Sequence, residues 1–95
     1  MVAVDDGETD WKVLCINVED PLSERLHDIG DVEREIPGLV SSAREWLRLY
    51  KTSDGKPPNE FALEERAMDK AYTMAVVEET HVFWQRLLEA GRKTV

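Results

Sequence analysis

Three charged residues close to the amino-terminus have the types and spacing to hold a metal ion beside a phosphate. Asp5, Asp10 and Lys12 fall within the stretch DDGETDWK, residues 5–12. Mg²⁺ prefers hard oxygen ligands and usually takes one or two carboxylates, with water and substrate oxygens in its other positions. A lysine ammonium supplies a compact positive charge for a phosphate. The same residues also fit a solvated acidic turn in which Lys12 pairs with a neighbouring carboxylate, and spacing alone leaves both interpretations open.

A tyrosine and a lysine that are adjacent in the chain, Tyr50 and Lys51, form a second candidate group. Both can donate a hydrogen bond to an anion, one through its hydroxyl and the other through its ammonium. The alternative is structural, because Tyr50 could complete the apolar face of a helix and Lys51 would favour the helix C-terminus. Both interpretations stay open on these two residues alone.

The other reactive side chains indicate no further site. His27 and His81 have no metal-ligand spacing with each other or with Cys15, and we expect His81 to be structural. The sequence contains no phosphate-binding glycine loop, nucleophile elbow or dinucleotide motif. One cysteine excludes an internal disulfide, and its place in the apolar run 13–16 predicts a small buried side chain.

The composition is typical of a small, acidic, globular domain. The 95 residues suffice for one domain, and 42% hydrophobic with 34% charged residues favour a folded chain. A formal charge of −8 predicts repulsion from nucleic acid and from anionic membranes, and an anionic substrate would need metal ions to bridge it to the protein. The sequence has no apolar run of about 18 residues and no recognisable secretory signal.

A β-hairpin is expected to position the first candidate group. An apolar run over residues 1–4 and a β-branched run over residues 11–18 flank an Asp-Gly dipeptide, which is typical of tight turns. On the second strand Asp10 and Lys12 would share one face with the apolar residues that follow at every second position. They would then lie at the rim of a cavity, with Asp5 reaching the same place from the first strand.

The rest of the chain has the periodicity of helices. Apolar spacing predicts helical segments over residues 21–28, 28–36, 39–51 and 64–88, with a loop over 52–60. Gly91 is expected to cap the last helix. The apolar face of that helix is predicted to carry Ala67, Ala71, Met74, Val77 or Glu78, His81, Trp84 and Leu88. The predicted fold class is therefore α+β, mostly helical with a β-hairpin near the amino-terminus.

Five stretches, taken in order, resemble one family. DDGETDWK, DPLSERLHDIGDVEREIPGL, EWLRLYK, DGKPPNEFAL and EETHVFWQRL are similar to the C-terminal part of the soluble family I inorganic pyrophosphatases of the eukaryotic type. The resemblance extends from about Val2 to Leu88. It implies an OB-like five-stranded β-barrel with flanking helices, of which residues 1–95 would be the C-terminal segment. Residues 1–20 would supply barrel strands, and residues 21–91 would be mainly helical.

The resemblance also implies an activity and roles for the candidate residues. Family members hydrolyse pyrophosphate to two phosphates with several Mg²⁺ ions. By this resemblance Asp5 and Asp10 are metal ligands, while Lys12, Tyr50 and Lys51 contact phosphate. No residue in this segment is assigned a catalytic role. The resemblance further implies a homodimer and a cytoplasmic location, with a mitochondrial form left open.

One motif of the family is absent. The sequence Asp-x-Asp-Pro-x-Asp, which supplies further aspartates in family members, does not occur, and EDPLSE at residues 19–24 matches it only faintly. Two carboxylates hold fewer metals than such chemistry needs. We therefore expect the 95-residue chain alone to be inactive. The alternatives are a non-catalytic pyrophosphatase-derived fragment that acts through protein association, and an unrelated acidic helical interaction domain.

Overall fold

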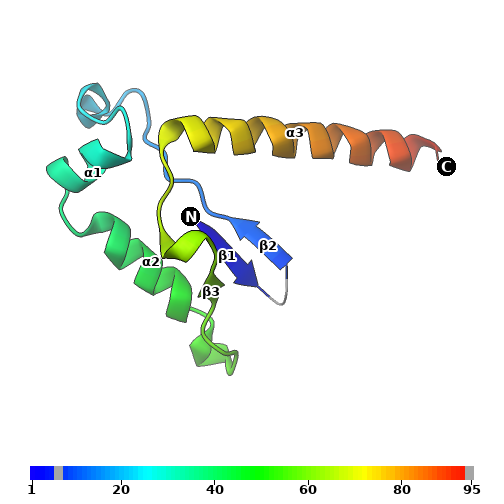
Figure 1. The fold of residues 1–95 in the computed structure, drawn as a ribbon, viewed down its shortest axis with the longest axis horizontal. Helices are drawn as coiled ribbons and strands as arrows, with labels where there is room; N and C mark the ends of the chain where they lie inside the picture. The colour runs from blue at the N-terminus through cyan, green and yellow to red at the C-terminus, as the bar shows by residue number, and fades with distance from the viewer. Residues whose placement is uncertain (6–7, 94–95) are drawn as a thin grey trace.

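A small antiparallel sheet forms the amino-terminal part of the molecule. The computed structural model describes residues 1–5 and 8–93, except the side chains of Asp5 and Lys93 (Figure 1). The strands are β1 (Val2–Asp5), β2 (Glu8–Trp11) and β3 (Glu60–Phe61), in the order β2-β1-β3. In the central strand, Ala3 is paired with Asp10 on one side and with Phe61 on the other.

The predicted hairpin is confirmed, but the predicted strand over residues 11–18 is wrong. β2 ends at Trp11, and residues 12–17 have no regular structure. The Lys12 backbone nitrogen still donates to the Met1 carbonyl at 2.9 Å. The other edge of β1 is occupied by β3. The Asp-Gly dipeptide at residues 6–7 lies outside the described part.

The helices follow in the predicted order. The 3₁₀ turn η1 (Pro21–Glu24), α1 (Ile29–Glu35) and α2 (Leu39–Leu49) lie where the periodicity predicted helix. A 3₁₀ turn, η2 (Thr52–Asp54), begins the predicted loop. A third turn, η3 (Leu63–Glu65), precedes the long helix α3 (Lys70–Lys93). The structure is thus mostly helical with a small sheet, which confirms the predicted α+β class.

One carboxylate accepts hydrogen bonds from the first residues of two helices. Asp28 is the N-cap of α1, where its Oδ1 accepts from the Ile29 nitrogen at 2.7 Å. The same Oδ1 accepts from the backbone nitrogen of Lys70, the first residue of α3, at 2.9 Å. Asp31 completes a capping box by accepting from the backbone nitrogens of His27 and Asp28. These hydrogen bonds, above all the one from His27, hold the pKa of Asp31 below its ordinary value.

A polar contact joins the end of α2 to β3. The buried Asn59 donates from its amide Nδ2 to the Leu47 carbonyl at 2.9 Å, and its backbone nitrogen donates to the Arg48 carbonyl at 2.9 Å. The Arg48 guanidinium bonds to Glu65 at 2.7 Å and lies 5.2 Å from the centroid of the Phe61 ring. The hydrogen bond to Glu65 is the main cause that raises the pKa of Arg48.

The start and end of the long helix differ from the prediction. Leu63, Glu64 and Glu65 have φ values of 58°, 56° and 64°, so η3 has left-handed backbone and α3 begins only at Lys70. Left-handed conformations are unfavourable for residues with a Cβ atom, and they interrupt the right-handed helix expected from residue 64. The expected cap at Gly91 is also wrong, because α3 continues through it to Lys93.

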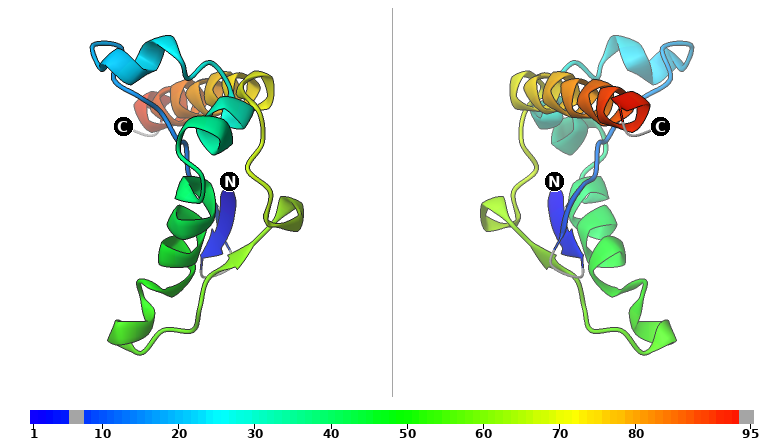
Figure 2. Two further views of the ribbon diagram at one scale, coloured as in Figure 1. Left: turned by 90° about the vertical axis from the view of Figure 1, so that its left-hand side faces the viewer. Right: turned by 90° about the vertical axis from the view of Figure 1, so that its right-hand side faces the viewer.

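The core is small and the molecule is extended. The buried apolar side chains are Val2, Ala3, Val32, Val40 and Val76. The radius of gyration is 16.3 Å, whereas a compact chain of this size has about 13 Å. Figures 1 and 2 show the reason: α3 runs above the sheet, and its carboxyl-terminal half extends past every other element.

The packing of α3 also corrects the predicted apolar face. Its buried side chain is Val76, which is not on the predicted face. On that face, Met74, Val77, Trp84 and Leu88 are between 40% and 53% exposed. The apolar periodicity of the sequence correctly indicated a helix. Which side of α3 packs depends on neighbouring elements, and the periodicity does not describe them. Within the described residues, no helix combines the length and apolar character needed to cross a membrane.

Candidate functional site

The structure pairs two of the predicted site residues directly. The Lys12 ammonium lies 2.8 Å from the Asp10 carboxylate Oδ2. Their side chains are 29% and 36% exposed, so each keeps a face open to a ligand. Asp10 lies in β2 beside Ala3 of the central strand, and Lys12 follows the end of that strand. The ladder therefore holds the two backbones in place, and the ion pair directs the ammonium toward the carboxylate.

The second predicted pair also stays together, at the end of α2. Tyr50 is the C-cap of α2, and the Lys51 nitrogen Nζ lies 5.6 Å from the centroid of its ring. The ring of Tyr50 stacks on Trp46, with centroids 4.9 Å apart and planes 7° apart. Trp46 is 65% exposed, and its ring orients that of Tyr50. The spacing of four residues on a helix was the signal for this contact.

The two pairs lie at opposite edges of the sheet. Asp10 belongs to β2, one edge strand, whereas the end of α2 is tied through Asn59 to β3, the other edge strand. The central strand β1 separates them. The described contacts bring the two residues together within each pair.

The fifth predicted residue, Asp5, ends β1, and its side chain lies outside the described part. Among the described side chains, no group of three or more His, Cys, Asp or Glu could hold a metal ion. The donor chemistry of Asp10 nevertheless fits Mg²⁺, because its partly exposed carboxylate can supply one hard oxygen ligand. The described residues thus fit part of a metal shell and require further ligands.

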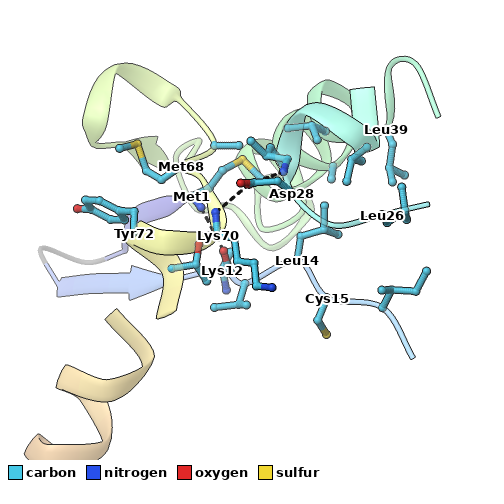
Figure 3. Close-up of a pocket in the computed structure, with 18 of the residues that line it drawn as sticks. Met1, Lys12, Leu14, Cys15, Leu26, Asp28, Leu39, Met68, Lys70 and Tyr72 are labelled. Atoms are coloured by element: carbon cyan, nitrogen blue, oxygen red, sulfur yellow. Dashed lines mark hydrogen bonds between the residues drawn. The ribbon is translucent and has the colours of Figure 1, made fainter. Parts of the chain in front are cut away.

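A separate cavity of about 590 Å³ opens between α1, α2, the start of α3 and the segment after β2 (Figure 3). Of the predicted site residues whose side chains are described, only Lys12 lines it, and most of the lining is apolar. Figure 3 shows Asp28 and Lys70 joined by their hydrogen bond beside the cavity. Cys15, which was predicted to be buried, is exposed here because its segment has no strand partner. Because most of the side chains that line this cavity are apolar, it is not the predicted phosphate site.

The two histidines have structural contacts. The His27 ring nitrogen Nε2 lies 2.8 Å from the Glu24 carbonyl, and the His81 ring stacks on Trp84 at 5.4 Å between centroids. These contacts agree with the structural role expected for His81.

Comparison with known proteins identifies the family. The family profile for inorganic pyrophosphatase matches residues 1–85. The chain belongs to the inorganic pyrophosphatase family. It is 47% identical to an inorganic pyrophosphatase of Candida glabrata over 94 residues, which cover 99% of this chain and 32% of that protein.

Solved structures of pyrophosphatases have the same fold. The vacuolar soluble pyrophosphatase of Trypanosoma cruzi in its apo form matches 97% of this chain with a TM-score of 0.91 and 38% identity, and the match covers 24% of that chain. An N-terminally truncated form of the T. cruzi protein in complex with PPi matches 93% of this chain with a TM-score of 0.88 and 39% identity, covering 34% of that chain. The chain thus spans about a third of the length of the curated relatives it matches.

Proposed function

We propose that this chain supplies one wall of a site that binds and hydrolyses pyrophosphate, and that the other wall comes from polypeptide beyond the 95 residues. The observation that carries the proposal is the Asp10–Lys12 pair, an accessible carboxylate and ammonium 2.8 Å apart at the end of the edge strand β2. Membership of the pyrophosphatase family supports it, as does the PPi complex of the T. cruzi relative.

The roles proposed for individual residues follow from their chemistry. Asp10, together with Asp5, would contribute carboxylate oxygens to Mg²⁺. Lys12 would donate to a phosphate oxygen, with Asp10 orienting its ammonium. Tyr50, held by its stacking on Trp46, would donate from its hydroxyl to a second phosphate oxygen.

Lys51 would add positive charge at the same end of α2. The chain as a whole carries a formal charge of −8. Mg²⁺, when bound, would neutralise the substrate and lower the pKa of a coordinated water. The residues of this chain would orient the phosphates, and the ligands that complete the metal shell would lie in the missing polypeptide. A homodimer and a cytoplasmic location belong to the same proposal.

The first test is phosphate release by the 95-residue chain with Mg²⁺ and pyrophosphate. We expect no turnover above a blank that contains metal and substrate only, because a clamp on both the attacking and the leaving oxygen needs more ligands than Asp5 and Asp10 provide. Turnover above the blank would contradict the inactivity of the isolated chain.

The second test uses a chimaera in which this chain replaces the matched 94 residues of the Candida glabrata pyrophosphatase. Lys12→Ala should lower kcat/KM for pyrophosphate by about 10- to 100-fold, the loss typical of a hydrogen bond to a charged group. Arg25→Ala is the matched control, because it removes the same charge from a side chain that is 69% exposed, pairs with Glu35 and is not one of the predicted site residues. Equal activity of the two variants would refute the role of Lys12.

A second function, association with another polypeptide, is favoured by the apolar side chains that this chain leaves exposed, notably on α3.

A further inference from the structure

The side chain of Tyr50 lies at a helix end, where the helix by itself does little to hold it. Tyr50 is the C-cap of α2, its backbone nitrogen donates to the Trp46 carbonyl at 2.9 Å, and it is 36% exposed. The backbone is therefore fixed one turn from Trp46, whereas the ring can still rotate about its side-chain bonds. A hydrogen bond weakens steeply when the donor points away from the acceptor. A contact other than the backbone must then set the direction of the Tyr50 hydroxyl.

The stacking of Trp46 on Tyr50 is such a contact. The two ring planes are 7° apart and the centroids are 4.9 Å apart, within the range of stacked aromatic pairs. Trp46 itself is 65% exposed, so its indole contributes little to the core. A stacked pair favours its own geometry by about 2- to 12-fold over an unstacked one. The indole therefore favours one of the possible ring orientations of Tyr50.

Lys51 contacts the same ring, but its ammonium has another task in the proposed site. The Lys51 nitrogen Nζ lies 5.6 Å from the Tyr50 ring centroid, within the range of a cation–π contact. When this ammonium turns to a phosphate oxygen, the ring loses the contact. The Trp46 stack uses no charged group of the site. Trp46 is thus a restraint on Tyr50 that a bound phosphate does not remove.

The carbonyls at the end of α2 have donors other than Lys51. Helix C-terminal carbonyls carry partial negative charge and often accept from a nearby basic side chain. Three of them accept hydrogen bonds from residues that follow the helix; they belong to Leu47, Arg48 and Leu49. Asn59 is the donor to the first two, and the Thr52 hydroxyl donates to the third at 2.7 Å. The capping role considered for Lys51 is therefore filled by other residues.

We propose that Trp46 is a positioning residue of the pyrophosphate site, which directs the Tyr50 hydroxyl toward a phosphate group through ring stacking. Trp46 acts through Tyr50 and not on the ligand itself. The inference rests on the proposed function, in which Tyr50 binds phosphate. Loss of the stack lowers the fraction of molecules whose hydroxyl is correctly placed, and the apparent affinity falls by the same factor. A contact made equally to bound substrate and transition state changes KM and leaves kcat unchanged.

The test uses the Candida glabrata chimaera, titrated with inorganic phosphate in the presence of Mg²⁺ by calorimetry and assayed for pyrophosphate hydrolysis. Trp46→Leu removes the stack and keeps an apolar helix former, whereas Trp46→Phe keeps an aromatic ring. Tyr50→Phe removes the hydroxyl and keeps the ring. Trp84→Leu is the matched control, since Trp84 is 53% exposed and stacks on His81 in α3. Thermal unfolding of each variant sets a temperature at which all of them are folded.

Trp46→Leu should weaken phosphate binding and raise KM by about 2- to 12-fold, with kcat within about twofold. Trp46→Phe should restore most of the affinity, because its ring can still stack on Tyr50. In the Tyr50→Phe background, Trp46→Leu should cost less than about twofold, because no hydroxyl is left to position.

Two results would overturn the positioning role of Trp46. One is an equal effect of Trp46→Leu with and without the Tyr50 hydroxyl, and the other is an equal effect of Trp84→Leu. A third result separates this inference from the proposed function. If Tyr50→Phe binds phosphate as tightly as the unchanged chimaera, the role of Tyr50 in the proposed function fails, and the positioning role of Trp46 fails with it.

Discussion

Replacement of Asp28 by alanine is expected to weaken two helices with one substitution. Its carboxylate Oδ1 accepts from the first residue of α1 at 2.7 Å and from the first residue of α3 at 2.9 Å. Loss of an N-cap acceptor costs about 1 kcal/mol, and both bonds are solvent-exposed, which favours the lower half of the range for each. Asp28→Ala should therefore lower the free energy of unfolding by about 1–2 kcal/mol.

Asparagine separates the hydrogen bonds from the charge. Asp28→Asn keeps an acceptor oxygen in the same place and removes only the favourable interaction of the carboxylate with the two helix dipoles, about 0.3–1 kcal/mol for each helix. Asp20→Ala is a control for the loss of a single cap, because among the described residues the Asp20 side chain accepts one hydrogen bond, from Leu22 in the short turn η1. We expect Asp28→Ala to destabilise the protein most, Asp28→Asn less, and Asp20→Ala least.

Two measurements check this prediction. Urea unfolding followed by circular dichroism gives the change in free energy. Amide hydrogen exchange then shows where in the structure the stability is lost. In Asp28→Ala the Lys70 amide should exchange up to about tenfold faster for each 1.4 kcal/mol of free energy lost at that site. The reasoning is refuted if Lys70 exchange is unchanged while the Ile29 amide is affected, because Asp28 would then cap α1 alone. It is also refuted if Asp28→Asn is as harmful as Asp28→Ala.

Three further predictions follow from other contacts. The pKa of Asp31 is held below 3.8 by hydrogen bonds. The stability that its carboxylate contributes is therefore complete above about pH 5 and is lost as the pH falls through the pKa in the folded state. Asp31→Asn should abolish this acid dependence, which circular dichroism between about pH 2 and 5 would follow. Asn59→Ala should cost about 1–3 kcal/mol in urea unfolding, since it leaves the Leu47 carbonyl without its buried donor, and a loss below about 0.5 kcal/mol would contradict this. Glu64→Gly should raise the stability by up to about 1 kcal/mol, because glycine tolerates a φ of 56°. Glu33→Gly in α1 is the control and should lower the stability by a similar amount. Two losses of equal size would show that η3 is not strained.

The sequence predicted the features that depend on local spacing. The hairpin, α2 and the order of the elements followed from apolar period and turn residues, since these patterns report which side of a segment avoids water. The pairs Asp10–Lys12 and Tyr50–Lys51 were also found from spacing, because residues this close in a strand or at a helix end stay close once the element forms. Their assignment to a pyrophosphatase site came from the family resemblance, and their roles stay predictions.

Other features could not be read from the sequence because they depend on partners far along the chain. β2 ends at Trp11 and Cys15 is exposed because, within the described residues, no neighbouring strand continues the ladder, although the apolar run at 13–16 looks like a strand core. The start of α3 at Lys70 is fixed in part by Asp28, 42 residues away. In this protein, then, the sequence by itself determined the type and order of the elements and the family. Only the tertiary structure decided where the elements end and which faces stay exposed, because long-range pairing and burial are absent from a local pattern.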